Sequence, residues 1–600
     1  MKSINEKKKT ALSSFVRYYE RPRGFGIGGA ADPTLYPKTI KNMYIDYEGG
    51  GDALESVPGF RRIYSFAGAV HSIIPMTLSG GEDCLFVHAG NGLYRFSRNE
   101  RDTLLDLAPI AEMSDGKSYC LHCGTMAFLL DGEKLIRING SGESETLSED
   151  KKIVGCRTLA LFDGRLFFSG NPDLPGEIFY SSRIDEENIA FPEEGQIKDS
   201  TCGIPISSLL SLGDGLWVFM ADDGGEGGII CHSATKGSDG KDEYPISRIF
   251  SGVCARGGAM AYLDEILFVS PDGLSAIERP RSDDCRIVLR SKSILPSLLS
   301  EKLSEAVLGI WQGYVTLSSQ GRIYLADTRG GVINGDLEWY LIDGVGGYRN
   351  DRRIYRYSTI AKEGYDLFTE ADAEAIGEII SLTDEDGESI YYEKRDGKKY
   401  LVYPTEEYTG GDFYPAVALL CHEGLMWFGT ESGELFLFNN DKRAEPPESL
   451  KVNEGFDREE FRRLNQGKIH PDFYAFGSHA SEYLVEYYPD GCGFDGQTKS
   501  TVSGSLAICC KTFSRSRLSF SVLADGREVL SRDISPTVFG FNELSFGDMP
   551  ASACDEVCVR LPERAVGWRK KQLIVSAKGF RAPIGIKSIG YRYKICKEKG

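Results

Sequence analysis

The chain has 600 residues, of which 41% are hydrophobic and 26% charged, so it is globular and has ample apolar surface for a sizeable core. Its net charge of −19 makes stable docking on bare DNA or on anionic lipid unfavourable, because such binding needs an excess of cations. The basic N-terminus lacks the apolar stretch of a secretory signal, and no run of 18 apolar residues predicts a membrane span.

Residues 1–66 are predicted to form an N-terminal arm and the lead into the main domain. Residues 21–37 (RPRGFGIGGAADPTLYP) are rich in Gly and Pro, which is typical of an extended segment. Their glycines resemble a phosphate-binding loop only in composition. A dinucleotide fingerprint needs a strand before the glycines and a helix after them, whereas Pro22 and Asp32-Pro33 flank this segment.

A repeated hairpin then runs through residues 67–440. Its first strands start 42, 39, 51, 50, 48, 51 and 60 residues apart. These strands are 84–88 (CLFVH), 126–130 (MAFLL), 165–169 (RLFFS), 216–220 (LWVFM), 266–270 (ILFVS), 314–318 (YVTLS), 365–369 (YDLFT) and 425–429 (LMWFG). The second strands are visible at 92–96 (GLYRF), 134–138 (KLIRI), 177–181 (EIFYS), 322–327 (RIYLAD) and 434–438 (ELFLF).

A period of ~40–50 residues with about four strands per unit is typical of a β-propeller blade. Eight copies of the hairpin predict an all-β propeller of seven or eight blades, with 365–369 as the weakest copy. A series of β-sandwiches remains the alternative. One helix is predicted within this region, at residues 295–308, because Leu295, Leu298, Leu299 and Leu303 recur at helical spacing and Pro296 falls in the first turn.

After about residue 440 the pattern changes. Residues 441–469 are highly charged and predict a linker. Residues 470–600 contain short alternating segments that predict a C-terminal β-sandwich. Those segments are 518–523 (LSFSVL), 557–561 (VCVRL), 572–576 (QLIVS) and 589–594 (IGYRYK).

Residues that carry chemistry do not gather into a recognised motif, so we expect no catalytic, cofactor-binding or metal-binding residues. Cys120, His122 and Cys123 lack a second pair at zinc-finger spacing. Residues 384–387 (DEDG) begin like a calcium loop, but Arg395 stands at its twelfth position. Residues 270–273 (SPDG) begin like the Asp-box of propeller glycosidases but are not followed by Trp.

The 15 cysteines have no framework spacing, and most lie within apolar runs. We therefore expect reduced thiols in the core of a protein made in a cytosol.

Several segments together resemble the phage tail nozzle family, also called tail tubular protein B. They are 41–46 (KNMYID), 56–61 (SVPGFR), 163–172 (DGRLFFSGNP), 178–181 (IFYS), 205–209 (PISSL), 217–219 (WVF), 252–255 (GVCA) and 266–274 (ILFVSPDGL). The C-terminal part resembles virion proteins of phages from Gram-positive bacteria, at 491–493 (GCG), 498–499 (TK), 567–569 (GWR) and 571–572 (KQ). The long region 344–412 and the N-terminal arm depart from the family pattern.

The resemblance implies a structural, non-enzymatic virion protein made in the host cytoplasm. Such proteins form a ring of copies, commonly six, at the end of the tail. They contact other tail or adaptor proteins, retain packaged DNA and guide its ejection. An acidic lumen would repel DNA phosphates and limit sticking. Two alternatives stay open: a propeller that binds a host-surface glycan or protein, and a propeller glycoside hydrolase with paired carboxylates.

Overall fold

The structure is a computed structural model. It describes residues 14–596 except for 27–33, 98–102, 105–107, 185–188, 198–202, 223–224, 256, 283, 330–335, 370–372, 384–388, 441–470, 512, 514–515 and 537–555. Nearly all of its regular structure is strand. The predicted linker, the DEDG segment and Gly28 and Gly29 of the glycine-rich segment lie outside the described residues.

Seven antiparallel sheets follow one another along the chain as propeller blades. Blade one contains β6 (Val70–Thr77), β7 (Asp83–Ala89), β8 (Gly92–Ser97), β9 (Thr103–Leu104) and β10 (Ala111–Glu112). Blade two contains β11 (Tyr119–Cys123), β12 (Met126–Leu130), β13 (Leu135–Ile138) and β14 (Ser144–Ser148). Blade three contains β15 (Thr158–Phe162), β16 (Arg165–Ser169), β17 (Ile178–Arg183) and β18 (Gln196–Ile197). A short helix, α1 (Lys151–Val154), joins the second blade to the third.

Blades four to six are equally regular. Blade four contains β19 (Ile206–Leu212), β20 (Gly215–Ala221), β21 (Gly227–Ser233) and β24 (Ile246–Ser251). Blade five contains β25 (Ala259–Tyr262), β26 (Glu265–Ser270), β27 (Gly273–Glu278) and β28 (Arg286–Leu289). Blade six contains β29 (Val307–Trp311), β30 (Tyr314–Ser319), β31 (Arg322–Asp327) and β32 (Glu338–Asp343). A small hairpin, β22 (Thr235–Lys236) and β23 (Asp242–Glu243), extends from blade four. Blades five and six are joined by η1 (Lys292–Ile294), α2 (Leu295–Leu298) and η2 (Leu303–Glu305).

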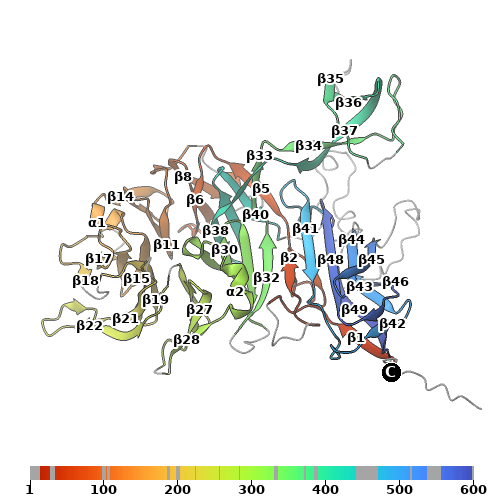
Figure 1. The fold of residues 1–600 in the computed structure, drawn as a ribbon. Coiled ribbons are helices and arrows are strands. Elements are labelled where there is room, and N and C mark those ends of the chain that lie inside the picture. The colour runs from red at the N-terminus through yellow and green to blue at the C-terminus, as the bar shows by residue number, and fades with distance from the viewer. Residues whose placement is uncertain are drawn as a thin grey trace, which may run out of the picture.

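The seventh blade closes the ring with strands from both ends of the propeller. It contains β33 (Gly346–Arg349), β38 (Asp412–His422), β39 (Leu425–Thr430), β40 (Glu434–Phe438) and the N-terminal β5 (Phe60–Ser65), in the order β33-β38-β39-β40-β5. The innermost strand of each blade contacts that of the next, and β38 contacts β6, so the circle is complete. The prediction of an all-β propeller is confirmed, with seven blades (Figure 1).

The eighth predicted hairpin belongs to an insertion between β33 and β38. This insertion is a separate sheet, β34-β37-β36-β35, made from β34 (Arg352–Tyr357), β35 (Ile379–Thr383), β36 (Ser389–Arg395) and β37 (Lys398–Thr409). It projects away from both larger parts of the molecule (Figure 1). Residues 365–369 form no strand in this sheet. Their backbone pairing is an isolated bridge between Asp366 and Tyr400.

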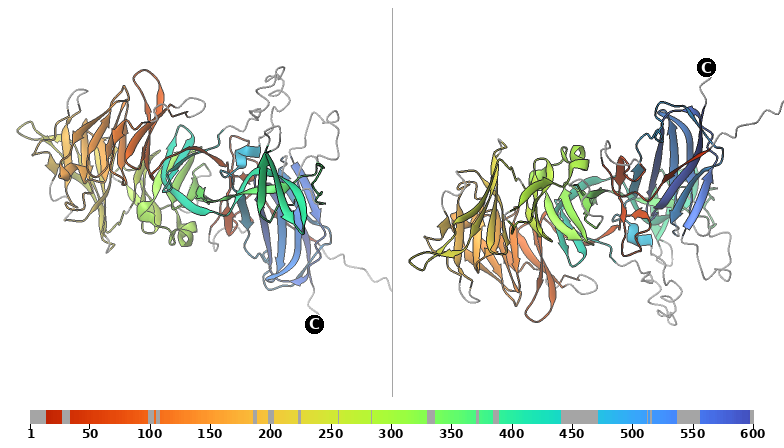
Figure 2. Two further views of the ribbon diagram at one scale, coloured as in Figure 1. Left: turned by 90° about the horizontal axis from the view of Figure 1, so that it is seen from above. Right: turned by 90° about the horizontal axis from the view of Figure 1, so that it is seen from below.

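The C-terminal part is a two-layer β-sandwich that includes the N-terminal strands. One layer continues blade six outwards through β2 (Thr39–Lys41) into β41 (Ser481–Glu486), β48 (Lys571–Gly579), β44 (Leu518–Ala524) and β45 (Arg527–Ile534), giving nine strands. The other layer has eight strands: β1 (Phe15–Tyr19), β3 (Met43–Ile45), β4 (Leu54–Ser56), β42 (Lys499–Thr501), β43 (Leu506–Lys511), β46 (Glu556–Leu561), β47 (Val566–Trp568) and β49 (Gly585–Ile595). A short turn, η3 (Pro471–Tyr474), precedes β41. Figure 2 shows propeller and sandwich side by side from two directions.

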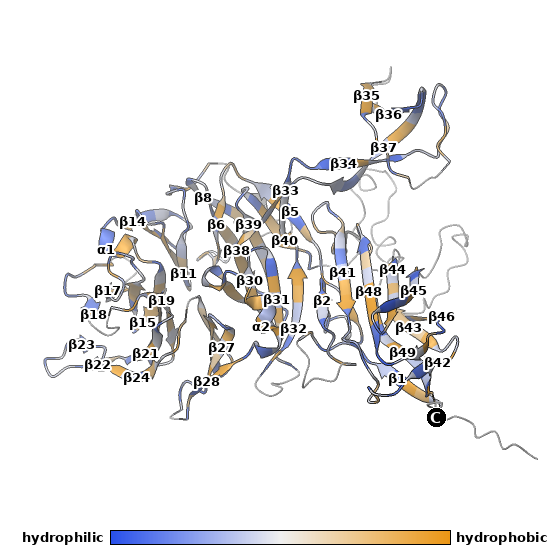
Figure 3. Ribbon diagram, in the orientation of Figure 1, coloured by the Kyte–Doolittle hydropathy of each residue, from blue (hydrophilic) through white to orange (hydrophobic). Residues whose placement is uncertain are grey.

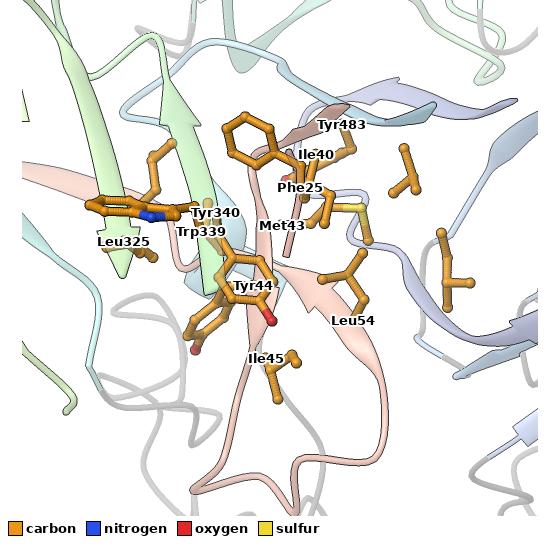
Figure 4. Packing of buried hydrophobic residues seen from close by; sticks show 14 of the residues in the cluster. Phe25, Ile40, Met43, Tyr44, Ile45, Leu54, Leu325, Trp339, Tyr340 and Tyr483 are labelled. Carbon is orange, nitrogen blue, oxygen red and sulfur yellow. The ribbon is translucent and has the colours of Figure 1, made fainter. Parts of the chain in front are cut away.

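A single hydrophobic core crosses the junction between the two parts. Phe25, Met43 and Tyr44 from the N-terminal segment pack with Trp339 of blade six and Tyr483 of the sandwich (Figure 4). Burial of each such side chain stabilises the junction by about 1.5–3 kcal/mol. The approach is close enough that a Cβ on Gly24 would lie 2.8 Å from the backbone nitrogen of Trp339. The described N-terminal residues, 14–26 and 34–65, are therefore an integral part of both domains.

Two further predictions need correction. The predicted helix at 295–308 is a single turn, because residues 307–311 instead pair with β30 as the innermost strand of blade six. Not all cysteines are reduced: Cys509 and Cys558 face each other on β43 and β46 and form a disulfide. Among the described residues, no helix has the length and apolar character needed to cross a membrane.

Candidate functional site

A cavity of about 560 Å³ lies where the propeller, the insertion and the sandwich meet. We call it the junction pocket. Its walls come from the end of β2, the turn between β32 and β33, the base of the insertion and the start of β41. It is lined by charged and aromatic side chains, among them Lys41, Tyr348, Glu407, His479 and Glu482.

Ion pairs cross the pocket between the propeller and the sandwich. Lys41 Nζ lies 3.0 Å from Asp343 Oδ2 and 3.7 Å from Glu482 Oε2, and Lys578 Nζ lies 3.1 Å from Glu482 Oε1. Burial would raise the pKa of Asp343, but Lys41 and Arg322 hold it below its ordinary value. Lys578, followed by Lys41, lowers the pKa of Glu482. Each of these carboxylates therefore stays ionised and tied to a lysine.

His479 braces the base of the insertion. Its ring stacks on Tyr348 at 3.8 Å between centroids, and its Nε2 lies 3.3 Å from the carbonyl oxygen of Gly410 and 3.6 Å from Asp351 Oδ2. Burial lowers the pKa of His479, although Asp351 and the Gly410 carbonyl oppose that shift. The imidazole is thus neutral at pH 7, and its Nε2–H donates to Gly410.

On the insertion side of the pocket, burial raises the pKa of Glu407, and Arg356 opposes the shift from 3.6 Å. General acid–base catalysis needs a proton-transfer group within hydrogen-bond reach of a reacting atom. The carboxylates of Asp343, Glu482 and Glu407 each contact a lysine or an arginine. Lys41 and Asp343 link the sandwich to blade six, and His479 and Gly410 link the sandwich entry to the base of the insertion.

The structure places the candidate metal ligands on the two faces of one strand, with Cys123 on the face opposite Cys120 and His122. Cys120, His122 and Cys123 lie on β11, the innermost strand of blade two, with Cys120 and His122 more exposed than Cys123. Burial raises the pKa of the Cys123 thiol to about 11, which disfavours the thiolate that a metal needs. In the described part of the chain, the three-residue donor group that could hold a metal is Cys509, Glu556 and Cys558, and its two sulfurs form the disulfide.

The SPDG segment is a structural turn. Residues 271–272 connect β26 to β27, and Ser270 Oγ donates a hydrogen bond to the carbonyl oxygen of Gly273.

The C-terminal motif residues come together as a buried polar cluster inside the sandwich. Lys571, which is fully buried, lies 3.1 Å from Glu563 Oε2 and donates to Thr501 Oγ1 at 2.5 Å. Its ammonium also lies 4.7 Å from the ring centroid of Trp568. Lys499 donates three hydrogen bonds, to the carbonyl oxygens of residues 494, 497 and 569. These motifs therefore tie β42, β47 and β48 together and expose no reactive group.

Sequence reasoning missed the residues that join distant segments. Asn42 has a positive φ of 58°, and its side chain bridges the carbonyl oxygen of Glu482 and the backbone N–H of Asp343. Arg17 reaches Asp490 Oδ2 at 2.6 Å. The positive φ is compatible with the tolerance of Asn for this region, but no sequence pattern shows which strands Asn42 connects.

Comparison with known proteins gives structural likeness only. No protein-family model and no curated protein matches the chain. Solved structures that match include BamB from Moraxella catarrhalis (12% identity, 64% of this chain and 99% of that chain, TM-score 0.33). Others are the Pan2 WD40 domain of Neurospora crassa (8% identity, 65% and 97%, TM-score 0.35) and the N-terminal domain of Nup159 (11% identity, 67% and 98%, TM-score 0.29). The chain is an all-β protein in which a seven-bladed propeller shares one sheet with a β-sandwich.

Proposed function

We propose that this chain is a structural component of a phage particle, a tail nozzle or neck protein that assembles as a ring of copies. In this role it retains packaged DNA and guides its release, and it catalyses no reaction. The proposal rests first on the resemblance of the blade segments to tail nozzle proteins. The burial of those segments in the propeller core is further support for the proposal.

The observation that carries the proposal is the shared nine-stranded sheet. Blade six is joined through β2 to the sandwich layer, with Lys41 paired to Leu341, so propeller and sandwich share one sheet. The segments that resemble the nozzle family are part of the propeller core: Phe167, Phe168 and Ile178 of blade three are fully buried. A rigid β body with broad faces suits a load-bearing ring.

Charge is consistent with a passage for DNA. Residues 1–469 contain 74 Asp and Glu against 51 Lys and Arg. A surface of this sign repels phosphates, so DNA can pass without being held.

The first experiment measures assembly. Purified protein is examined by sedimentation velocity and by negative-stain electron microscopy. We expect a closed ring with a central opening; a strictly monomeric protein at all concentrations would contradict the proposal. Gold-labelled antibodies against the chain should then decorate one end of the tail on intact particles, and labelling elsewhere or nowhere would contradict the assigned position.

A second candidate function is a binding module for a host-surface glycan or protein. It is favoured by the insertion, which projects into solvent and exposes large apolar side chains such as Ile360 and Ile376. Such groups mark interaction sites. Binding of the purified protein to host cells or a glycan array, lost when the insertion is replaced by a short linker, would favour this candidate over the ring.

A further inference from the structure

Charge is distributed unevenly along this acidic chain. Residues 470–600 contain 18 Lys and Arg against 14 Asp and Glu, so the C-terminal part is net positive. The insertion, residues 352–409, contains 14 Asp and Glu against 8 Lys and Arg. Two parts of the same molecule therefore carry opposite charge.

The positive charge lies on the outer face of the eight-stranded layer. Arg592 on β49 stands opposite Val16 on β1, and Lys594 stands opposite Ser500, which in turn stands opposite Val566. Arg560 lies in the row that runs through Ala507 and Gly590 to Tyr18. Directly paired residues share one face of a sheet, so these side chains form a single surface. We call this surface the basic face, and its members are Val16, Tyr18, Arg560, Val566, Arg592 and Lys594.

The apolar members of the basic face are open to solvent. Val566 is 79% exposed, and more than half of Val16 and of Tyr18 is exposed. Their neighbours on the other side of the layer, such as Tyr591 and Ile589, are buried in the core. An apolar and basic sheet face of this kind is typical of an interaction surface.

The insertion carries a surface of complementary character. Ile376 is 79% exposed and stands between Glu374 and Glu378, which are also exposed. Leu367 is exposed next to Asp366, and Leu382 is exposed on β35, which Figure 3 colours as largely hydrophobic. We call the exposed side chains of this region the acidic surface; they are Ile360, Glu363, Asp366, Leu367, Glu374, Ile376, Glu378 and Leu382.

We propose that the acidic surface of one copy docks on the basic face of the next copy. The occupant is a second copy of this chain because each surface offers what the other lacks: carboxylates against arginine and lysine, with apolar side chains on both sides. The contact is head-to-tail, since two different surfaces meet, and repeated head-to-tail contacts form a ring when the rotation from copy to copy closes a full turn. In Figure 1 the insertion lies above the sandwich while β1 lies at its lower edge. The inference rests on the proposed ring and names the surfaces that build it.

Charge reversal tests the contact. Arg592→Glu with Lys594→Glu reverses the basic face, and Glu363→Lys with Glu378→Lys reverses the acidic surface. Each pair of substitutions should raise the protein concentration needed for assembly by at least about tenfold in sedimentation velocity, because like charges then face each other. The matched control, Arg527→Glu with Arg532→Glu on β45, makes the same charge change on exposed cations of the same sandwich and should leave assembly unchanged.

Mixing the two reversed variants separates a lost contact from misfolding. In an equimolar mixture, every contact again joins opposite charges when the variants alternate around the ring. Assembly should return in the mixture to near the wild-type concentration. Assembly of the wild type should also weaken as NaCl rises, since salt screens exposed charges.

The outcomes distinguish this inference from the proposed function. If the wild type forms a ring and both reversed variants form it equally well, the assigned surfaces are wrong while the ring proposal stands. If the mixture fails to reassemble although both variants are folded by circular dichroism, the pairing of these two surfaces is also wrong. If the wild type never self-associates, the ring proposal fails and takes this inference with it.

Discussion

At the scale of single residues, Lys571 and Glu563 form a fully buried ion pair in the sandwich, and each charge depends on the other because neither is solvated. Burial lowers the pKa of Lys571, and Glu563 opposes that shift, so the lysine depends on its partner to stay charged. Lys571→Met leaves Glu563 buried without its cation, and we expect a loss of about 3–5 kcal/mol in the free energy of opening of β48. Native-state hydrogen exchange measures this.

The neighbouring Lys570 is exposed and provides the control: Lys570→Met should change the opening free energy by no more than about 0.5 kcal/mol. The double variant Lys571→Met with Glu563→Gln should recover part of the loss, because no buried charge remains. Equal losses in the single and double variants would show that the ion pair contributes nothing beyond packing.

A second residue-scale prediction concerns pH. His88 is fully buried in the first blade, where its ring contacts Ser118 Oγ and the carbonyl oxygens of Gly90 and Ser114. Burial, followed by the charge of His71, lowers the pKa of His88 to about 4. In the unfolded chain a histidine titrates near pH ~6.5, so the unfolded state binds the proton first as pH falls.

The stability that neutral His88 confers is therefore complete above pH ~6.5 and is lost as pH falls toward 4, by a total of about 3 kcal/mol. Hydrogen-exchange protection of β7 and β8 should fall over this window. His88→Gln should flatten the pH dependence, whereas His122→Gln, at an exposed position of β11, should not change it. An unchanged slope in the His88 variant would refute the assignment.

At the scale of elements, β5 holds the ring closed. It is the outermost strand of blade seven although it precedes blade one in the sequence. Phe60 at its start packs against Phe428, Phe436 and Phe476, with ring centroids 4.9–5.5 Å apart. Phe60→Ala should cost about 3–5 kcal/mol, because it leaves a cavity in this aromatic cluster.

Limited proteolysis should then cut blade seven faster in the Phe60→Ala variant, while the earlier blades stay protected. Arg61→Ala, on the exposed side of the same strand, is the control and should be cut like the wild type. Uniform loss of protection in all blades would show that closure is not local to blade seven.

At the scale of the whole molecule, Asn42 connects propeller to sandwich. Its side chain donates to the carbonyl oxygen of Glu482 and accepts from the N–H of Asp343, and its backbone holds a positive φ. Asn42→Ala loses both hydrogen bonds and strains the backbone, for a combined cost of about 3 kcal/mol. We expect the junction to loosen, seen as a larger radius of gyration in small-angle X-ray scattering.

Asn42→Gly separates the two contributions, because glycine relieves the strained φ but restores no hydrogen bond. Its stability should lie between those of the wild type and of Asn42→Ala. If the alanine variant scatters like the wild type, the core around Trp339 and Met43 suffices to hold the two parts together.

The blades could be predicted from local sequence patterns. Hairpins such as β15–β16 are local: Asp163 and Gly164 both have positive φ, and the strands they connect pair with near neighbours in the chain. Short continuous apolar runs such as RLFFS then show which strands are buried, so the propeller class and the packing role of such segments could be predicted. The insertion and the exact blade count could not be predicted from the sequence. Residues 365–369 have the composition of a strand, but they form only an isolated bridge and belong to no blade.

The positions of the N-terminal strands could not be predicted from local patterns, because they depend on long-range pairing. β1, β2 and β5 pair with β49, β41 and β40, which lie hundreds of residues later, and a three-residue strand such as β2 carries no recognisable periodicity. The junction pocket, the Arg17–Asp490 pair and the basic face depend on those long-range pairings. Their energies come from contacts between segments whose separation in sequence leaves no local pattern, so a strand-by-strand prediction cannot find them.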